Sequence, residues 1–133
     1  MRVIGSGSLT PSLLGVLDID NGSDPVTVGA RPAASEFWFP QVANGDGLFT
    51  GLALASGDVP ANITVEVYPA SGGFPKSATV QLDHDQQSAR LLGEIVNGVS
   101  TQVGGYIHIR SDQPIWAWEI YGSDRIQASG PPL

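Results

Sequence analysis

Glycine and proline recur at short, regular intervals along the chain, with 17 glycines and 10 prolines in 133 residues. Both residue types interrupt helices and mark turns. The segments between them are short and rich in β-branched and aromatic residues, which is the composition of strands. This punctuation predicts an all-β protein built from many short strands.

Alternation of apolar and polar residues places the expected strands. The clearest alternation is at 62–68, where Ile63, Val65 and Val67 are expected to face inward. Segment 89–96 is compatible with a helix, but Gly93 interrupts it and no cap frames it, so we expect a strand followed by one short helical turn. The expected strands are 13–20, 26–30, 36–40, 48–55, 62–68, 77–82, 106–110, 115–121 and 125–128.

Nine or ten short strands predict an antiparallel β-sandwich, immunoglobulin-like or jelly-roll-like, with a barrel as the less favoured alternative. The length suits one domain with its own hydrophobic core. We expect a flexible lead-in at 1–12, a strand hairpin at 13–31, the sandwich domain at 36–129 and a tail at 130–133.

The charge balance narrows the classes of partner. Thirteen acidic residues against six basic ones give a net charge of −7, and Lys76 is the only lysine. Such a chain would repel a phosphate backbone or an anionic membrane surface, so we expect no nucleic-acid partner. No segment is apolar over the length of a membrane span, so no membrane insertion is expected. With no cysteine, disulfides and thiolate metal sites are excluded.

Two stretches share one pattern of glycine, an apolar run, a turn with Ser-Asp and Pro, and a second apolar run. The longer is 104–122, GGYIHIRSDQPIWAWEIYG, and the shorter is 15–30, GVLDIDNGSDPVTVGA. In the longer one, 106–110 and 115–121 are joined by Ser-Asp-Gln-Pro at 111–114. We interpret both as hairpins, with the shorter one preceding a complete domain.

From Phe39 the chain reads FPQVANGDGLFTGLALAS, then ITVEVYPASGGFP, TVQLDHDQQSARLLGEI and finally the 104–122 stretch. This succession resembles the uncharacterised β-sandwich repeats of large secreted and cell-surface proteins of soil bacteria, over residues 37–122. Two positions depart from the family pattern. Ser56 stands where asparagine is usual, and Asp83-His84-Asp85 replaces a proline-glycine turn.

The resemblance implies export and a non-catalytic role as a spacer or adhesion module. It also makes 13–31 resemble the closing hairpin of a preceding repeat. The apolar residues of that hairpin are the candidate assembly surface, because they could pack on their own domain or add strands to a neighbouring molecule. They are Leu13, Val16, Leu17, Ile19, Val26 and Val28.

Exposed aromatic residues are the candidate ligand-binding site. Trp38 and Trp116, with Tyr68 or Tyr106, would offer a platform on which sugar rings stack. The competing interpretation, which we favour, places most tryptophans in the core because they bury large apolar areas. Only one face of 115–121 is then expected to be core, with Trp118 and Ile120 buried and the Trp116 indole N–H reaching water.

Calcium is the cofactor that the sequence suggests, at Asp18, Asp20 and Asp24, because a hard cation prefers several oxygen ligands from one turn. The spacing does not match an EF-hand, and the ordinary interpretation is an acidic strand edge. Asp83-His84-Asp85 is a second polar turn of this kind. Otherwise no cofactor is expected.

No catalytic motif is present. The chain has no Gly-x-Ser-x-Gly motif, His108 is expected to face solvent or a cross-strand partner, and Glu66, Glu94 and Glu119 stand isolated. We therefore expect a non-enzymatic extracellular or cell-surface module that assembles with copies of itself or with a neighbouring repeat. The alternative is a carbohydrate-binding module whose partner is a polysaccharide.

Overall fold

The computed structural model describes residues 2–7, 12–18, 26–123, 127–130 and 132, and side chains within 32–123 and at 132. These residues form twelve strands and one helical turn, α1 (Leu92–Ile95). The all-β class is confirmed. The strands are β1 (Arg2–Gly7), β2 (Ser12–Asp18), β3 (Val26–Pro32), β4 (Ala34–Phe39), β5 (Ala43–Asn44), β6 (Leu48–Ser56), β7 (Ala61–Tyr68), β8 (Lys76–Leu82), β9 (Gln87–Leu91), β10 (Gln102–Val103), β11 (Tyr106–Ser123) and β12 (Gln127–Gly130).

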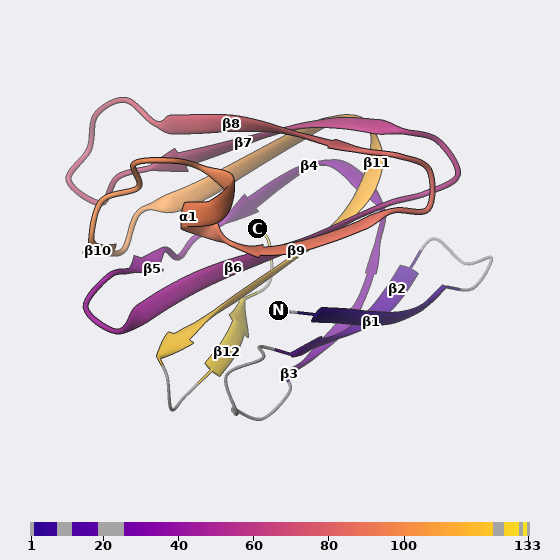
Figure 1. Cartoon of the computed structure of the whole chain (residues 1–133), viewed down its shortest axis with the longest axis horizontal. Helices are drawn as coiled ribbons and strands as arrows, with labels where there is room; N and C mark the ends of the chain where they lie inside the picture. Colours follow the sequence, from indigo (N-terminus) through magenta and orange to yellow (C-terminus); the bar gives the residue numbers. More distant parts are fainter. Residues whose placement is uncertain (1, 8–11, 19–25, 124–126, 131, 133) are drawn as a thin grey trace.

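The strands make three antiparallel sheets (Figure 1). A small N-terminal sheet has the order β1-β2-β3, and β5 pairs with β10. The main sheet contains seven strands, in the order β8-β7-β11-β6-β9, with β4 and β12 also pairing with β11. The main sheet curls, so that β7 and β8 lie on one side of the molecule and β6 and β9 on the other (Figure 1).

Strand β11 runs unbroken for 18 residues, so the predicted turn at 111–114 is wrong. Ser111 still pairs with Ile63, and Asp112 accepts hydrogen bonds from the main-chain and side-chain nitrogens of Asn62 at 2.8 and 2.9 Å. Pro114 cannot donate to a ladder and lies where the register with β4 shifts. The segment therefore bends one strand instead of reversing the chain.

The bend lets β11 serve both sides of the curled sheet. Its first half pairs with β7 and β4, and its second half pairs with β6 and β12. The two packed faces predicted for a sandwich are therefore parts of one continuous sheet. The main core lies inside the curl and includes Phe37, Phe39, Leu52, Leu54, Ile63, Val65, Val67, Leu92, Val96, Ile107, Ile109 and Ile115. The inward positions predicted for 62–68 are confirmed.

The short helical turn predicted within 89–96 is confirmed. Strand β9 ends at Leu91 and α1 follows at once. The carboxylate of Glu94 accepts a hydrogen bond from the Leu91 N–H at 2.8 Å, which supplies the cap that the sequence did not reveal. Leu92 and Val96 are fully buried and close one end of the main core. No helix among the described residues is long and apolar enough to cross a membrane.

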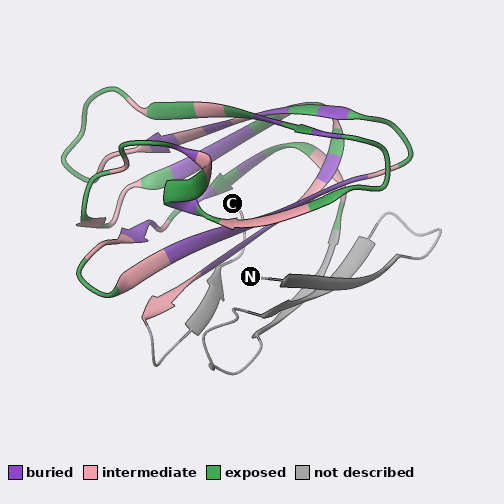
Figure 2. Ribbon diagram, in the orientation of Figure 1, coloured by how far each residue is buried: buried purple, intermediate pink, exposed green. Residues whose placement is uncertain are grey.

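Both faces of the second half of β11 are buried, whereas the sequence predicted one (Figure 2). Ile115 and Ala117 join the main core, and Trp118 and Ile120 join a second hydrophobic cluster with Ala53 and Ala55. The extra layer is the N-terminal sheet, since β1 contacts β9 and β3 contacts β11. Trp118 and Ile120 are buried, as expected.

The N-terminal segment contains more structure than the sequence indicated. Arg2–Gly7 is strand β1 and pairs with β2, although residues 1–12 were expected to be a flexible lead-in. Strands β2 and β3 pair as the hairpin predicted for 13–31. This sheet contacts β9, β11 and β12 of the same chain.

Glu119 is an acidic side chain in the main core. It alternates with Ile115 and Ala117, is fully buried, and neither carboxyl oxygen has a hydrogen-bond partner among the described residues. Burial raises the pKa of Glu119 to about 8. The folded protein therefore keeps this carboxyl protonated at neutral pH, because a lone carboxylate in an apolar core is poorly solvated.

This buried carboxyl predicts a pH-dependent stability. The pKa of Glu119 in the folded protein lies above the ordinary value of 4.5. The contribution of this carboxyl to the free energy of unfolding is therefore complete below about pH 4.5 and is lost as the pH rises toward 8. We expect the stability of Glu119→Gln relative to wild type to increase by about 3 kcal/mol between pH 5 and pH 7.5. Urea denaturation of both proteins across this range is the measurement. A constant difference would contradict the assignment.

Candidate functional site

The outward face of the β4-β11-β7 part of the sheet carries the candidate site. Phe37, Ile107 and Val65 of these strands face the core, so their neighbours in sequence face outward. The register places them in cross-strand pairs along this face. We call the group the aromatic–charged face, and it consists of Glu36, Trp38, Glu66, Tyr68, Tyr106, His108 and Arg110.

Three aromatic side chains form a row on this face. The Tyr68 and Tyr106 rings stack with centroids 4.4 Å apart, and Tyr106 lies 5.7 Å from Trp38 at an angle of 41°. Trp38 and Tyr106 remain 36% and 39% exposed, although they are large hydrophobic residues. Their exposed area is a platform that other molecules can contact.

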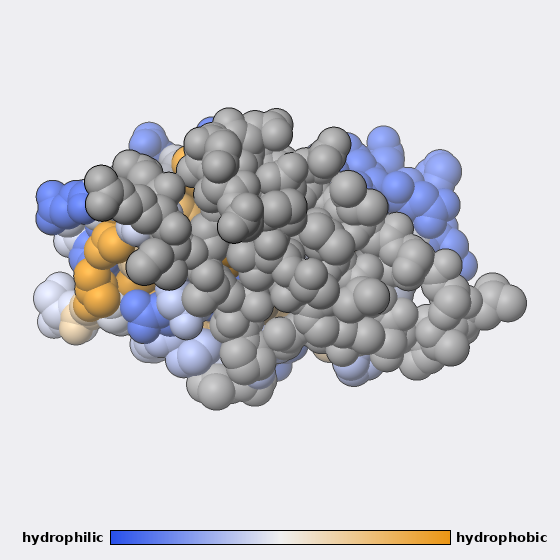
Figure 3. Space-filling view, turned by 90° about the horizontal axis from the view of Figure 1, so that it is seen from below, coloured by the Kyte–Doolittle hydropathy of each residue, from blue (hydrophilic) through white to orange (hydrophobic). Residues whose placement is uncertain are grey.

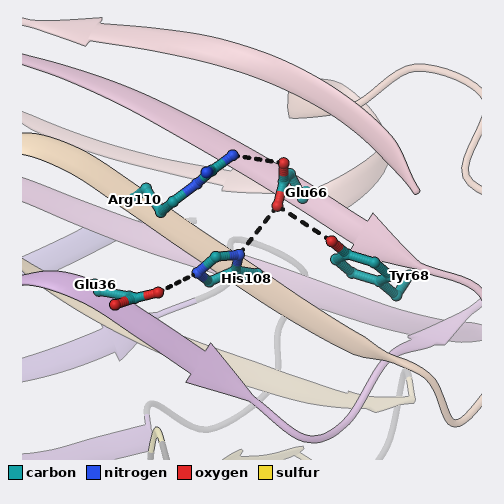
Figure 4. A network of polar contacts seen from close by, with 5 residues as sticks. All are labelled: Glu36, Glu66, Tyr68, His108 and Arg110. Atoms are coloured by element: carbon teal, nitrogen blue, oxygen red, sulfur yellow. Dashed lines mark hydrogen bonds and ion pairs between the residues drawn. The ribbon is translucent and has the colours of Figure 1, made fainter. Parts of the chain in front are cut away.

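His108 supports the Trp38 indole. The two rings stack at a centroid distance of 3.6 Å and an angle of 9°. Nε2 of His108 lies 2.6 Å from Glu36 Oε1, and Nδ1 lies 3.0 Å from Glu66 Oε2 (Figure 4). An imidazolium donates to both carboxylates, whereas a neutral ring has only one N–H. Two contacts of this kind hold the ring plane, and with it the plane of Trp38.

Glu66 is the centre of the polar network (Figure 4). Its Oε1 accepts a hydrogen bond from Arg110 Nη2 at 2.7 Å, and its Oε2 faces both His108 and the Tyr68 hydroxyl, the latter at 3.5 Å. Its side chain is 16% exposed, against 57% for Glu36. Partial burial, followed by the charge of Glu66, raises the pKa of Tyr68, so the phenol keeps its proton.

A shallow apolar hollow of about 490 Å³ adjoins the platform, lined by Trp38, Phe39, Pro40, Gly105 and Tyr106. Gly105 has a φ of 81°, and a Cβ there would collide with the main-chain oxygen of Tyr68. Only glycine therefore lets the chain enter β11 this close to β7. The hollow adjoins β5 and β10, because Pro40 lies just before β5 and Gly105 just after β10. In Figure 3 the described residues at the end with the β8–β9 connection are hydrophilic, whereas the opposite end shows both hydrophobic and hydrophilic residues.

The structure brings together three of the four aromatic residues proposed from the sequence, namely Trp38, Tyr68 and Tyr106. Trp116 lies elsewhere, opposite Ala55 and packed against the second hydrophobic cluster. Its indole nitrogen is buried without a partner among the described residues, so the expected contact with water is wrong.

The polar members of the face were missed from the sequence. His108 is 7% exposed and has cross-strand partners on both sides. Of the two environments expected for it, solvent or a cross-strand partner, the structure shows the second. Glu66 is not isolated. Its contacts with His108 and Arg110 join residues more than 40 positions apart in the sequence. Alternation could show that these side chains share an outward face, but not which strands are neighbours.

The calcium prediction at Asp18, Asp20 and Asp24 stays a prediction. Asp20 and Asp24 lie outside the described residues, as does the side chain of Asp18. The same holds for the candidate assembly residues, since Ile19 and the side chains of the others, in β2 and β3, are not described. Among the described residues, no three His, Asp or Glu side chains are placed to hold a metal ion.

The Asp83-His84-Asp85 turn contacts Ser56 through hydrogen bonds. The Ser56 hydroxyl donates to the Asp83 carbonyl and accepts from the Gln86 N–H. His84 and Asp85 are exposed. These contacts indicate a structural role for the turn.

Comparisons with known proteins support the fold. No protein-family model matches the chain, and neither does any curated protein sequence. The crystal structure of Thermotoga maritima 1070 is similar to it, with a TM-score of 0.61 at 16% sequence identity. The match covers 74% of this chain and 93% of that one. At this identity the likeness shows a shared fold.

The network predicts unequal effects of removing its two carboxylates. We expect Glu66→Gln to lower the free energy of unfolding by about 2 kcal/mol, because Glu66 is largely buried and contacts three partners. Glu36→Gln, which changes a side chain that is mostly exposed, should cost less than about 1 kcal/mol. Urea denaturation at pH 7 measures both. Equal losses would contradict a network centred on Glu66.

Proposed function

We propose that the protein is a non-enzymatic extracellular module that binds carbohydrate on the aromatic–charged face. The observation that carries this proposal is the exposed pair Trp38 and Tyr106 beside an apolar hollow. Each ring is backed by a second ring, His108 or Tyr68, so its plane is set before a ligand arrives. Preorganised contacts of this kind lower the entropic cost of binding.

A sugar ring matches this face chemically. Its C–H surfaces stack on aromatic rings, and its hydroxyl groups lie at the ring edge, where they need hydrogen-bond partners. Glu36 and Arg110 are polar, more than half exposed and on the same face as Trp38. The net charge of −7 disfavours phosphorylated ligands and nucleic acid, whereas it imposes no penalty on a neutral polysaccharide.

The platform predicts which substitutions abolish binding. We expect wild-type protein to be retained on at least one insoluble polysaccharide, and Trp38→Ala and Tyr106→Ala to lose at least about ten-fold in affinity, because each removes a stacking surface. Phe74→Ala is the control, since Phe74 is 95% exposed and lies outside the face. Circular dichroism should show all three variants folded.

A polysaccharide pull-down and a glycan array measure this binding. Equal retention of Trp38→Ala and Phe74→Ala would refute the site. Absence of wild-type binding to every polysaccharide would refute the function.

Assembly is the second proposed function, and the second hydrophobic cluster favours it. Trp118 and Ile120 are buried on the face that the N-terminal sheet covers. That sheet is a separate three-stranded unit connected to the domain through β3. An identical sheet from another copy would cover the same cluster, so exchange of this sheet would link molecules in a ring or fibre.

Deleting residues 1–31 tests this covering role. We expect the shortened chain to melt at least several degrees lower than the full chain, because the apolar residues of the cluster become exposed. A synthetic peptide of residues 1–31, added in trans, should restore part of the melting temperature, and a scrambled peptide is the control. Light scattering of the full chain over a range of concentrations reports exchange. An unchanged melting temperature and mass would contradict the proposal.

A further inference from the structure

Glu36 and Arg110 form a polar end to the aromatic–charged face. They are cross-strand neighbours, and their side chains are 57% and 56% exposed. Glu36 uses Oε1 to contact His108, and its Oε2 has no partner among the described residues. Arg110 uses Nη2 to contact Glu66, and its other N–H groups have none. Within the part of the chain that the structure describes, the pair therefore leaves one carboxylate oxygen and several N–H groups without a partner.

Each of the two side chains is anchored by a less exposed partner. The His108 side chain is 8% exposed and holds Glu36, and the Glu66 side chain is 16% exposed and holds Arg110. Anchoring of this kind limits the rotamers of two otherwise flexible side chains. Binding of a ligand to these two side chains therefore loses less side-chain entropy than binding to flexible surface charges usually does.

The polar end is separated from the hollow by the length of the platform. Tyr106, which lines the hollow, and Arg110 are four residues apart on β11, or about 13 Å at the usual rise of a strand. Trp38 and His108 occupy the cross-strand pair between them. A single ring stacked on Tyr106 would therefore leave Arg110 uncontacted.

We propose that Glu36 and Arg110 form a second subsite, and that the ligand is a neutral oligosaccharide of at least two residues lying along β4 and β11. This rests on the proposed carbohydrate binding. One sugar stacks on Trp38 and Tyr106 at the hollow. Neighbouring hydroxyls of the next sugar contact the second subsite, one donating to Glu36 Oε2 and another accepting from the planar Arg110 guanidinium.

The charges of the subsite specify a neutral ligand. The Arg110 charge is already paired with Glu66, and Glu36 adds a further carboxylate, so an acidic sugar attracted by the guanidinium would also be repelled by carboxylate oxygens. A hydroxyl both donates and accepts, so it satisfies either group without a charge penalty. A phosphate or sulfate group has only acceptors here and would leave Glu36 Oε2 unpaired.

The test is the dependence of affinity on oligosaccharide length. Calorimetry would use β-1,4-linked gluco-oligosaccharides of one to four residues, and the same lengths from any polysaccharide retained in the pull-down. We expect wild-type affinity to rise at least about ten-fold from one residue to three. Glu36→Gln and Arg110→Lys should each remove most of that rise, so that the affinity of each variant for three residues falls toward its affinity for one. Arg90→Lys, on β9, is the matched control.

The outcomes separate this inference from the proposed function. Binding that requires Trp38 but does not rise with length would overturn the second subsite and leave carbohydrate binding intact. Length dependence that persists in both Glu36→Gln and Arg110→Lys would also overturn it. If no oligosaccharide of any length binds to wild type, both proposals are refuted.

Discussion

Main-chain hydrogen bonding to β11 holds the two sides of the curled sheet together. Its first half pairs with β7 and β4, and its second half pairs with β6 and β12. Four neighbours on one strand require a bend, and the bend lies where Pro114 interrupts the ladder with β4. The core inside the curl follows from this geometry, because one strand presents Ile107 and Ile109 from one half and Ile115 from the other.

The same strand also builds the candidate site. Tyr106, His108 and Arg110 are the outward residues of its first half, and each is paired with a chemically matched side chain on β7 or β4. Aromatic rings oppose aromatic rings, and charged groups oppose groups of opposite charge or a hydrogen-bonding ring. The site is therefore rigid for the reason that the sheet is rigid, since its side chains are spaced by the ladder.

Two buried features of this strand have different consequences. His108 is compensated, because both ring nitrogens face carboxylates. Glu119 is not, and its raised pKa reflects burial without a partner. The first contributes to the aromatic–charged face, whereas the second lowers stability as the pH rises. A polar residue on the outward face of a strand, such as His108, can thus find polar partners. One on the core-facing side, such as Glu119, destabilises the fold when it ionises.

Local pattern determined much of this protein. Glycine and proline spacing predicted an all-β chain, and alternation predicted the inward residues of β7 and the helical turn after β9, because these depend on neighbours in sequence. The sequence also proposed Trp38, Tyr68 and Tyr106 as a platform, but it proposed Trp116 with them, and the structure places Trp116 elsewhere. Alternation could not predict that both faces of 115–121 are buried, because the second layer comes from the N-terminal sheet.

Tertiary structure alone decided the rest. The Ser-Asp-Gln-Pro segment has the composition of a turn, but pairing of Ser111 with Ile63 and the bonds from Asn62 to Asp112 keep β11 extended. The partners of His108 come from β4 and β7, which lie far from it in sequence. Long-range packing of the whole core decides which strands become neighbours. The sequence by itself therefore determined most strands and their inward residues, whereas only the fold determined the candidate site.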